Sequence, residues 1–156
     1  MQQQQQPLLY TGAPTWILHA GNYVGLYELP GSAKDHPQIV AWLAACGLPS
    51  QHDETAWCSA FANAVMREAG FRTLNLANAR SWLNWGAPLQ QWRFGCVGVY
   101  SAADRGPDAG HVGFPLQEDP KTHLVLGGNQ QNHVCVSPYD RGRLLGYRWP
   151  LLSDVR

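Results

Sequence analysis

The stretch DETAWCSAF, residues 53–61, says more about the fold than any other part of the sequence. Thr55 has the chemistry of a helix N-cap, and apolar residues at helical spacing follow it as far as Gly70, a typical helix stop. The sequence therefore predicts a helix over residues 56–69 with Cys58 in its first turn. The N–H groups and partial positive charge at a helix start favour a thiolate and can bind an oxyanion. Cys58 is a candidate nucleophile; a cysteine that only packs the helix is an equally good interpretation of this stretch alone.

Helices are expected in the first half of the chain and strands in the second. A helix is predicted from Pro14 to about Tyr27, another from His36-Pro37 to Cys46-Gly47, and a short one over residues 77–85. Short apolar runs between turn residues predict strands over residues 96–100, 111–117, 122–127, 134–136 and 144–149. Helices followed by an antiparallel sheet predict an α+β fold.

The composition describes one compact domain. The chain has 156 residues, of which 45% are hydrophobic and 14% charged, close to the commonest domain size. We expect a single domain over residues 13–156, preceded by a disordered glutamine-rich segment over residues 1–12. The formal net charge is zero, which disfavours a nucleic-acid partner because phosphate binding needs an excess of basic residues.

Membrane spans, leader peptides and metal sites are not expected. No run approaches the roughly 20 apolar residues that cross a bilayer, and MQQQQQPLLYTG has neither the basic nor the apolar part of a secretory signal. The cysteines at 46, 58, 96 and 135 lack the CxxC spacing that is typical of structural zinc. A disulfide between two of Cys46, Cys96 and Cys135 stays open, although free cysteines are more often small buried residues.

A histidine follows a loop rich in Gly, Pro and Asp, in the stretch GHVGF, residues 110–114. His111 at the mouth of a strand can face the helix start and act as a base, although a lone histidine is more often a surface or core-edge residue. The turn signal EDPK, residues 118–121, predicts a hairpin whose paired positions sum to about 239–240. Asn129 then lies near the His111 ring and can orient it; the alternative for residues 127–130 is a simple turn.

Several blocks of the sequence, taken in order, resemble one known family. They are DETAWCSAF (53–61), ARSWLNWG (79–86), GHVGF (110–114), LGGNQ (126–130) and LGYR (145–148). Together, over about residues 16–150, they resemble the bacterial and phage branch of the NlpC/P60 and CHAP cysteine peptidase superfamily. The resemblance implies a papain-like fold with N-terminal helices packed on a C-terminal antiparallel sheet. It also implies Cys58 as nucleophile, His111 as base and Asn129 as the orienting residue.

The resemblance further implies hydrolysis of an amide bond in peptidoglycan through a thioester, with no metal or cofactor. The bond lies within the stem peptide (an endopeptidase) or between sugar and peptide (an N-acetylmuramoyl-L-alanine amidase). Asp53 and Glu54 are candidates for binding a free amine of the stem peptide, with a role at the helix start as the alternative. Trp57, Trp85 and Gly110 are candidates for the substrate groove, with core packing as the alternative for Trp57.

Relatives of this kind act as phage lysins, cell-wall remodelling enzymes or secreted antibacterial effectors. Peptidoglycan is therefore the expected partner, joined by an immunity protein if the chain is an effector. We expect synthesis in the cytoplasm and action in the periplasm or cell wall after delivery by a holin or a secretion system. Two other classes stay open: an acyltransferase on the same fold, and a non-catalytic module that binds the cell wall.

Overall fold

The structure, a computed structural model, describes residues 7, 12–31, 34–49 and 51–156. Most of the glutamine-rich segment lies outside the described residues. The disorder expected over residues 1–12 therefore concerns a part of the chain that the structure does not describe. The α-helices are α1 (Thr15–Asn22), α2 (Pro37–Ala45) and α3 (Cys58–Glu68). The strands are β1 (Ala87–Leu89), β2 (Val97–Ser101), β3 (Gly110–Glu118), β4 (Thr122–Gln130), β5 (His133–Asp140) and β6 (Leu144–Trp149). Short 3₁₀ helices lie at Ala79–Asn84, Ala103–Arg105, Arg141–Arg143 and Leu152–Asp154.

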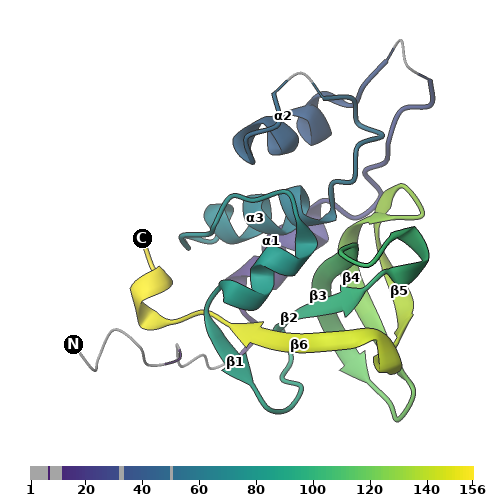
Figure 1. Cartoon of the computed structure of the whole chain (residues 1–156). Helices are drawn as coiled ribbons and strands as arrows, with labels where there is room; N and C mark the ends of the chain where they lie inside the picture. The colour runs from purple at the N-terminus through teal and green to yellow at the C-terminus, as the bar shows by residue number, and fades with distance from the viewer. Residues whose placement is uncertain (1–6, 8–11, 32–33, 50) are drawn as a thin grey trace.

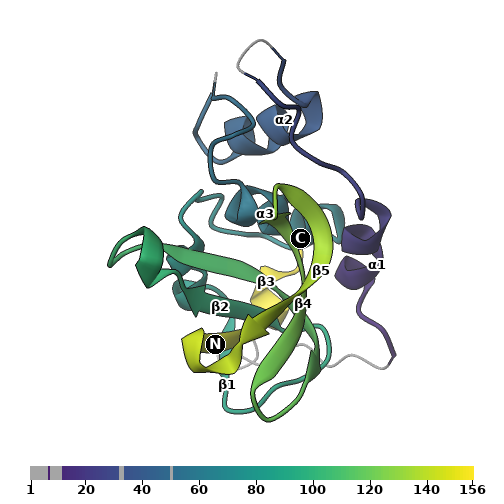
Figure 2. The same cartoon turned by 90° about the vertical axis from the view of Figure 1, so that its right-hand side faces the viewer.

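The strands form one antiparallel sheet in the order β1-β6-β2-β3-β4-β5, so β2 and β3 occupy its centre. Helices α1 and α3 lie against the sheet, and α2 lies on the far side of α3 (Figure 1). The view turned by 90° shows how strongly the β4–β5 ribbon twists as it leaves the centre of the sheet (Figure 2), as two-stranded ribbons do. The predicted α+β class is confirmed.

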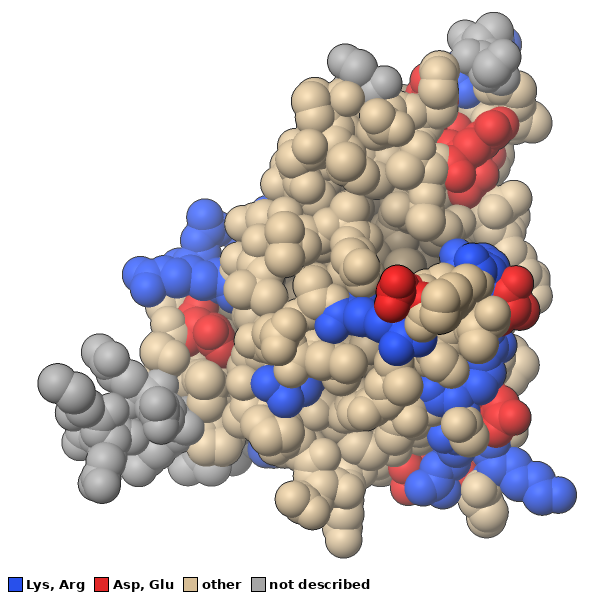
Figure 3. Space-filling view, viewed as in Figure 1, with Lys and Arg blue, Asp and Glu red and all other residues tan. Residues whose placement is uncertain are grey.

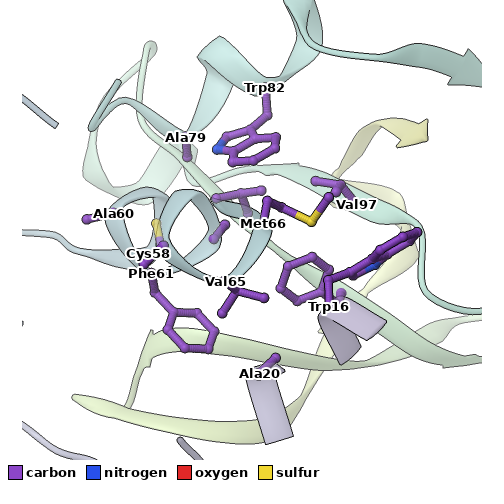
Figure 4. Packing of buried hydrophobic residues seen from close by; sticks show 14 of the residues in the cluster. Trp16, Ala20, Cys58, Ala60, Phe61, Val65, Met66, Ala79, Trp82 and Val97 are labelled. Atoms are coloured by element: carbon purple, nitrogen blue, oxygen red, sulfur yellow. The ribbon is translucent and has the colours of Figure 1, made fainter. Parts of the chain in front are cut away.

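Helix α3 is the centre of the hydrophobic core, because all its residues from Cys58 to Met66 are buried. Figure 4 shows the side chains packed around it, with Trp16 and Trp82 along its length and Cys58 at one end. The indole N–H of Trp82 donates to the Ser59 hydroxyl at 3.0 Å, so these two buried polar groups are hydrogen bonded to each other. The core therefore fixes the position of the helix start that carries Cys58.

Several predicted boundaries are wrong, each for a local reason. Helix α1 ends at Asn22 and not near Tyr27, because the following segment pairs with β5: the Gly25 N–H donates to Val134 O at 2.9 Å. Thr55 is not the cap of α3; its hydroxyl donates to Gln51, and the helix begins at Cys58. Strand β1 is an edge strand with Pro88 at its middle. It was not predicted because the sequence Ala-Pro-Leu does not alternate between polar and apolar residues.

The predicted hairpin is confirmed, but its register matches the expected sum of about 239–240 only away from the turn, where Phe114 pairs with Leu126 and Pro115 with Val125. The ladder shifts between Pro115 and Gln117, so the pair beside the turn, Glu118–His123, sums to 241. In the described part of the chain, no helix is both long enough and apolar enough to cross a membrane.

Candidate active site

Cys58 is the first residue of α3, and Trp57 is the N-cap. The first intrahelical hydrogen bond joins the Phe61 N–H to Trp57 O, so the N–H groups before it are left without helical acceptors. The Cys58 thiol lies next to strand β3, close enough to the Val112 N–H for that group to lower the pKa of the thiol. The helix start and the central strand therefore meet at this sulfur.

The His111 ring on β3 is fixed on two sides. Its Nε2 is hydrogen bonded to Gln130 Oε1 at 2.9 Å, inside the protein. The Tyr139 ring stacks on it with centroids 4.5 Å apart and an interplanar angle of 4°. These two contacts leave the imidazole little freedom to tilt or to turn.

The hydrogen bonds of Gln130 decide which ring nitrogen of His111 carries the proton. The Gln130 amide nitrogen donates to two backbone carbonyls, Val125 O at 3.0 Å and Cys135 O at 2.7 Å. The amide oxygen therefore faces His111 as an acceptor, and His111 Nε2 must be the donor. The neutral ring then keeps Nδ1 unprotonated, which is the form that a general base needs.

Gln130, and not the predicted Asn129, holds the orienting position beside His111. The β4–β5 register shifts between Gly127 and Gln130, and Asn129 has a left-handed backbone with φ 55°. This irregularity moves the next side chain, that of Gln130, onto the face that carries His111. Asn129 still lines the cleft with Cys58 and His111.

Two glycines before this irregularity make the arrangement possible. A Cβ at Gly127 would lie 2.6 Å from Gln130 Oε1, and one at Gly128 would lie 2.7 Å from Phe61 Cβ on α3. Gly127 thus leaves room for the hydrogen bond of His111, and Gly128 allows α3 to approach β4 closely.

Burial keeps both reactive groups neutral. It raises the pKa of the Cys58 thiol, while the Val112 N–H and the charge of Arg105 act in the opposite direction. The N–H groups of Cys58 and Ser59 at the helix start also lower this pKa, as expected, but burial of the sulfur outweighs them. Burial also lowers the pKa of His111 to about 4. A neutral thiol and a neutral imidazole describe the resting site at pH 7.

The cleft above these groups is small, with a volume of about 200 Å³. It is lined by Cys58, Ala102, Asp104, Arg105, His111, Asn129, Tyr139 and Arg143. A second recess of about 180 Å³ shares Cys58 and Arg105 with it and is lined otherwise mainly by small residues, including Ala56, Ala77, Ala79, Ala109 and Gly110. Cys58 therefore lies between a basic recess and a second recess that is lined mostly by small residues. Larger hollows elsewhere lack both Cys58 and His111.

The predicted substrate-binding residues divide into two groups. Gly110 lies at the site, in the second recess beside Cys58. Trp57 and Trp85 are 0% and 3% exposed and belong to the core, so neither forms a groove wall. Asp53 is buried, and its Oδ2 accepts the backbone N–H groups of Leu29 and His36, which gives it a structural role.

Glu54 is exposed in a different hollow, together with Glu28 and His133. That hollow does not include Cys58, so the structure does not bring Glu54 together with the nucleophile. The residues that sequence reasoning missed are Gln130, Tyr139, Arg105 and Arg143. Only Gln130 had a usable signal, because it adjoins Asn129 in the GGNQ stretch.

All four cysteines are free. Among the described residues, no three His, Cys, Asp or Glu side chains are grouped so that they could hold a metal ion. No protein-family model matches the chain, and a search of curated proteins found no match either. What the site can do is therefore inferred from its geometry.

Proposed function

We propose that this protein is a papain-like cysteine hydrolase that cleaves an amide bond of peptidoglycan through a thioester on Cys58. The observation that carries the proposal is the meeting of Cys58, at a helix start, with an oriented neutral His111 in one cleft. A nucleophile, a base and a residue that orients the base are the parts that covalent amide hydrolysis requires.

The reaction proceeds in two stages. His111 Nδ1 takes the Cys58 proton as the sulfur attacks the carbonyl carbon, and the oxyanion is stabilised by N–H groups of the first turn of α3. The imidazolium then gives its proton to the leaving amine, and the C–N bond breaks. Water attacks the thioester while His111 accepts its proton, and the acid product leaves with the thiol restored.

Two further features support a papain-like arrangement. The nucleophile is on a buried helix early in the chain, and the base and its partner are on neighbouring strands β3 and β4 of the following sheet. The choice of peptidoglycan rests on the five sequence blocks that resemble NlpC/P60 and CHAP enzymes. The same resemblance supports action in the periplasm or cell wall, as a phage lysin or a secreted antibacterial effector.

Digestion of purified sacculi tests the proposal. Wild-type protein should release fragments with new amine termini, and the position of those termini identifies an endopeptidase or an amidase. Cys58→Ala and His111→Ala should each abolish release, because covalent chemistry needs both groups. Cys46→Ser is the matched control, since it removes a thiol at the end of α2 that lines neither recess.

Retention of cleavage by Cys58→Ala would overturn the mechanism, and binding without cleavage by the wild type would indicate a wall-binding module. Addition of a free amine during digestion separates the remaining class. A product in which the acyl group has moved to that amine in preference to water would identify an acyltransferase.

A further inference from the structure

Two arginines reach the cleft from different connections of the sheet. Arg105 ends the 3₁₀ helix that follows β2, and Arg143 ends the 3₁₀ helix that precedes β6. Both line the same recess as Cys58 and His111. In the view of Figure 3, basic side chains with acidic ones between them gather over the end of the sheet where these connections lie.

The internal contacts of these arginines leave positive charge in the recess. Arg143 donates to Ser101 O at 3.0 Å and to Asp104 Oδ1 at 2.9 Å, whereas Arg105 donates to the backbone carbonyl of Gly110 at 3.2 Å. Asp108 lines the adjoining recess and forms no ion pair with either arginine. Two guanidinium groups thus face one carboxylate, that of Asp104, which is largely exposed.

The recess suits an anion of a particular size and kind. Its volume of about 200 Å³ is close to that of one amino-acid residue, so a group bound by the arginines also lies beside the thiol. Guanidinium groups are suited to planar two-oxygen acceptors, and a single excess positive charge suits a single carboxylate.

We propose that Arg105 and Arg143 bind a free carboxylate of the substrate, next to the amide that Cys58 attacks. This inference rests on the proposed hydrolase function and names the part of the substrate that the cleft selects. The preferred substrate is an amide-linked peptide with an ionised carboxylate on the residue adjoining the scissile bond, and the same peptide with a carboxamide there is a poor substrate.

A pair of synthetic stem peptides tests the selection. They differ only in the glutamyl α-carboxyl group, which is free in one and converted to the primary amide in the other. Wild-type protein should cleave the free acid with a kcat/KM about tenfold higher or more, because a charge-assisted pair is replaced by a neutral one. Arg105→Gln and Arg143→Gln should each lower kcat/KM more for the acid than for the amide, so that the preference for the acid falls by about tenfold.

Arg72→Gln is the matched control, since it removes the same charge from an exposed residue that lines neither recess. It should keep the wild-type preference for the acid. A wild-type midpoint of urea unfolding for the two recess variants shows that they are folded, so a smaller preference for the acid reports on the recess.

The outcomes separate this inference from the function on which it rests. If the wild type cleaves neither peptide nor any sacculus, the hydrolase proposal fails. If it cleaves both peptides equally well, or if the recess variants keep the full preference for the acid, the hydrolase proposal stands and the carboxylate site is refuted.

Discussion

The buried imidazole of His111 should make the stability of the protein depend on pH in a way that one substitution removes. His111 is 4% exposed, and burial lowers its pKa to about 4 in the folded protein, against about 6.5 when unfolded. Between these values the unfolded chain binds more protons than the folded one, so the free energy of unfolding rises with pH. The contribution of His111 is present above about pH 6.5 and is lost progressively as the pH falls from there to about 4.

The size of the effect follows from the two pKa values. Relative to pH 7.5, proton linkage at this one group costs about 2 kcal/mol of stability at pH 5 and about 3 kcal/mol at pH 4. For a domain whose total stability is typically about 5–15 kcal/mol, such a loss is large.

Urea unfolding of the wild type and of His111→Gln at pH 7.5, 6, 5 and 4 measures this contribution. Other titrating groups are shared, so the difference between the two proteins isolates His111. The stability of the variant should fall by about 2 kcal/mol less than that of the wild type between pH 7.5 and pH 5. The same substitution at the exposed His133 should keep the wild-type fall. Parallel pH curves for the wild type and His111→Gln would refute the linkage.

Three other outcomes follow from the structure. Gly127→Ala should leave the protein folded but lower kcat by tenfold or more, because the new Cβ displaces the Gln130 amide from His111; unchanged kcat, measured beside circular dichroism, contradicts this. Asp53→Ala should lower the free energy of unfolding by about 1–3 kcal/mol, since two backbone N–H groups lose their acceptor; denaturant unfolding checks this. Alkylation of Cys58, followed site by site by mass spectrometry, should keep rising with pH to pH 9 and beyond, because burial raises the pKa of the thiol; a plateau between pH 6 and pH 8 would show a thiolate at rest.

The parts of the fold that the sequence predicts well are those set by local pattern. Helix α3 was located to within two residues at its start, because the apolar spacing after residue 57 and Gly70 at its end are local signals. The β3–β4 hairpin was also correct, because the EDPK turn joins the two strands that flank it, although the register shift between Pro115 and Gln117 puts the pairs beside the turn one residue away from the expected count.

The errors arise where tertiary contacts override the local pattern. Residues 23–27 have helical spacing, yet they pair with β5, since the bonds of Gly25 and Leu26 to Val134 satisfy the backbone there. Gln130 was missed because counting residues from a turn assumes a regular ladder, and Asn129 breaks it. Arg105 and Arg143 are 38 residues apart, and no periodicity links two connections of a sheet.

In the proposed hydrolase, the two arginines also couple the binding of a substrate carboxylate to the basicity of His111. Their charges lower the pKa of His111 further, in addition to burial, so the imidazole is a weak base while the recess is empty. A carboxylate bound between them would offset that charge and raise the basicity of His111. The same carboxylate would weaken the help that Arg105 gives to a Cys58 thiolate, so proton transfer to His111 becomes the route by which the sulfur is activated. A neutral resting pair is then consistent with catalysis, because the base gains strength when the substrate that needs it is bound.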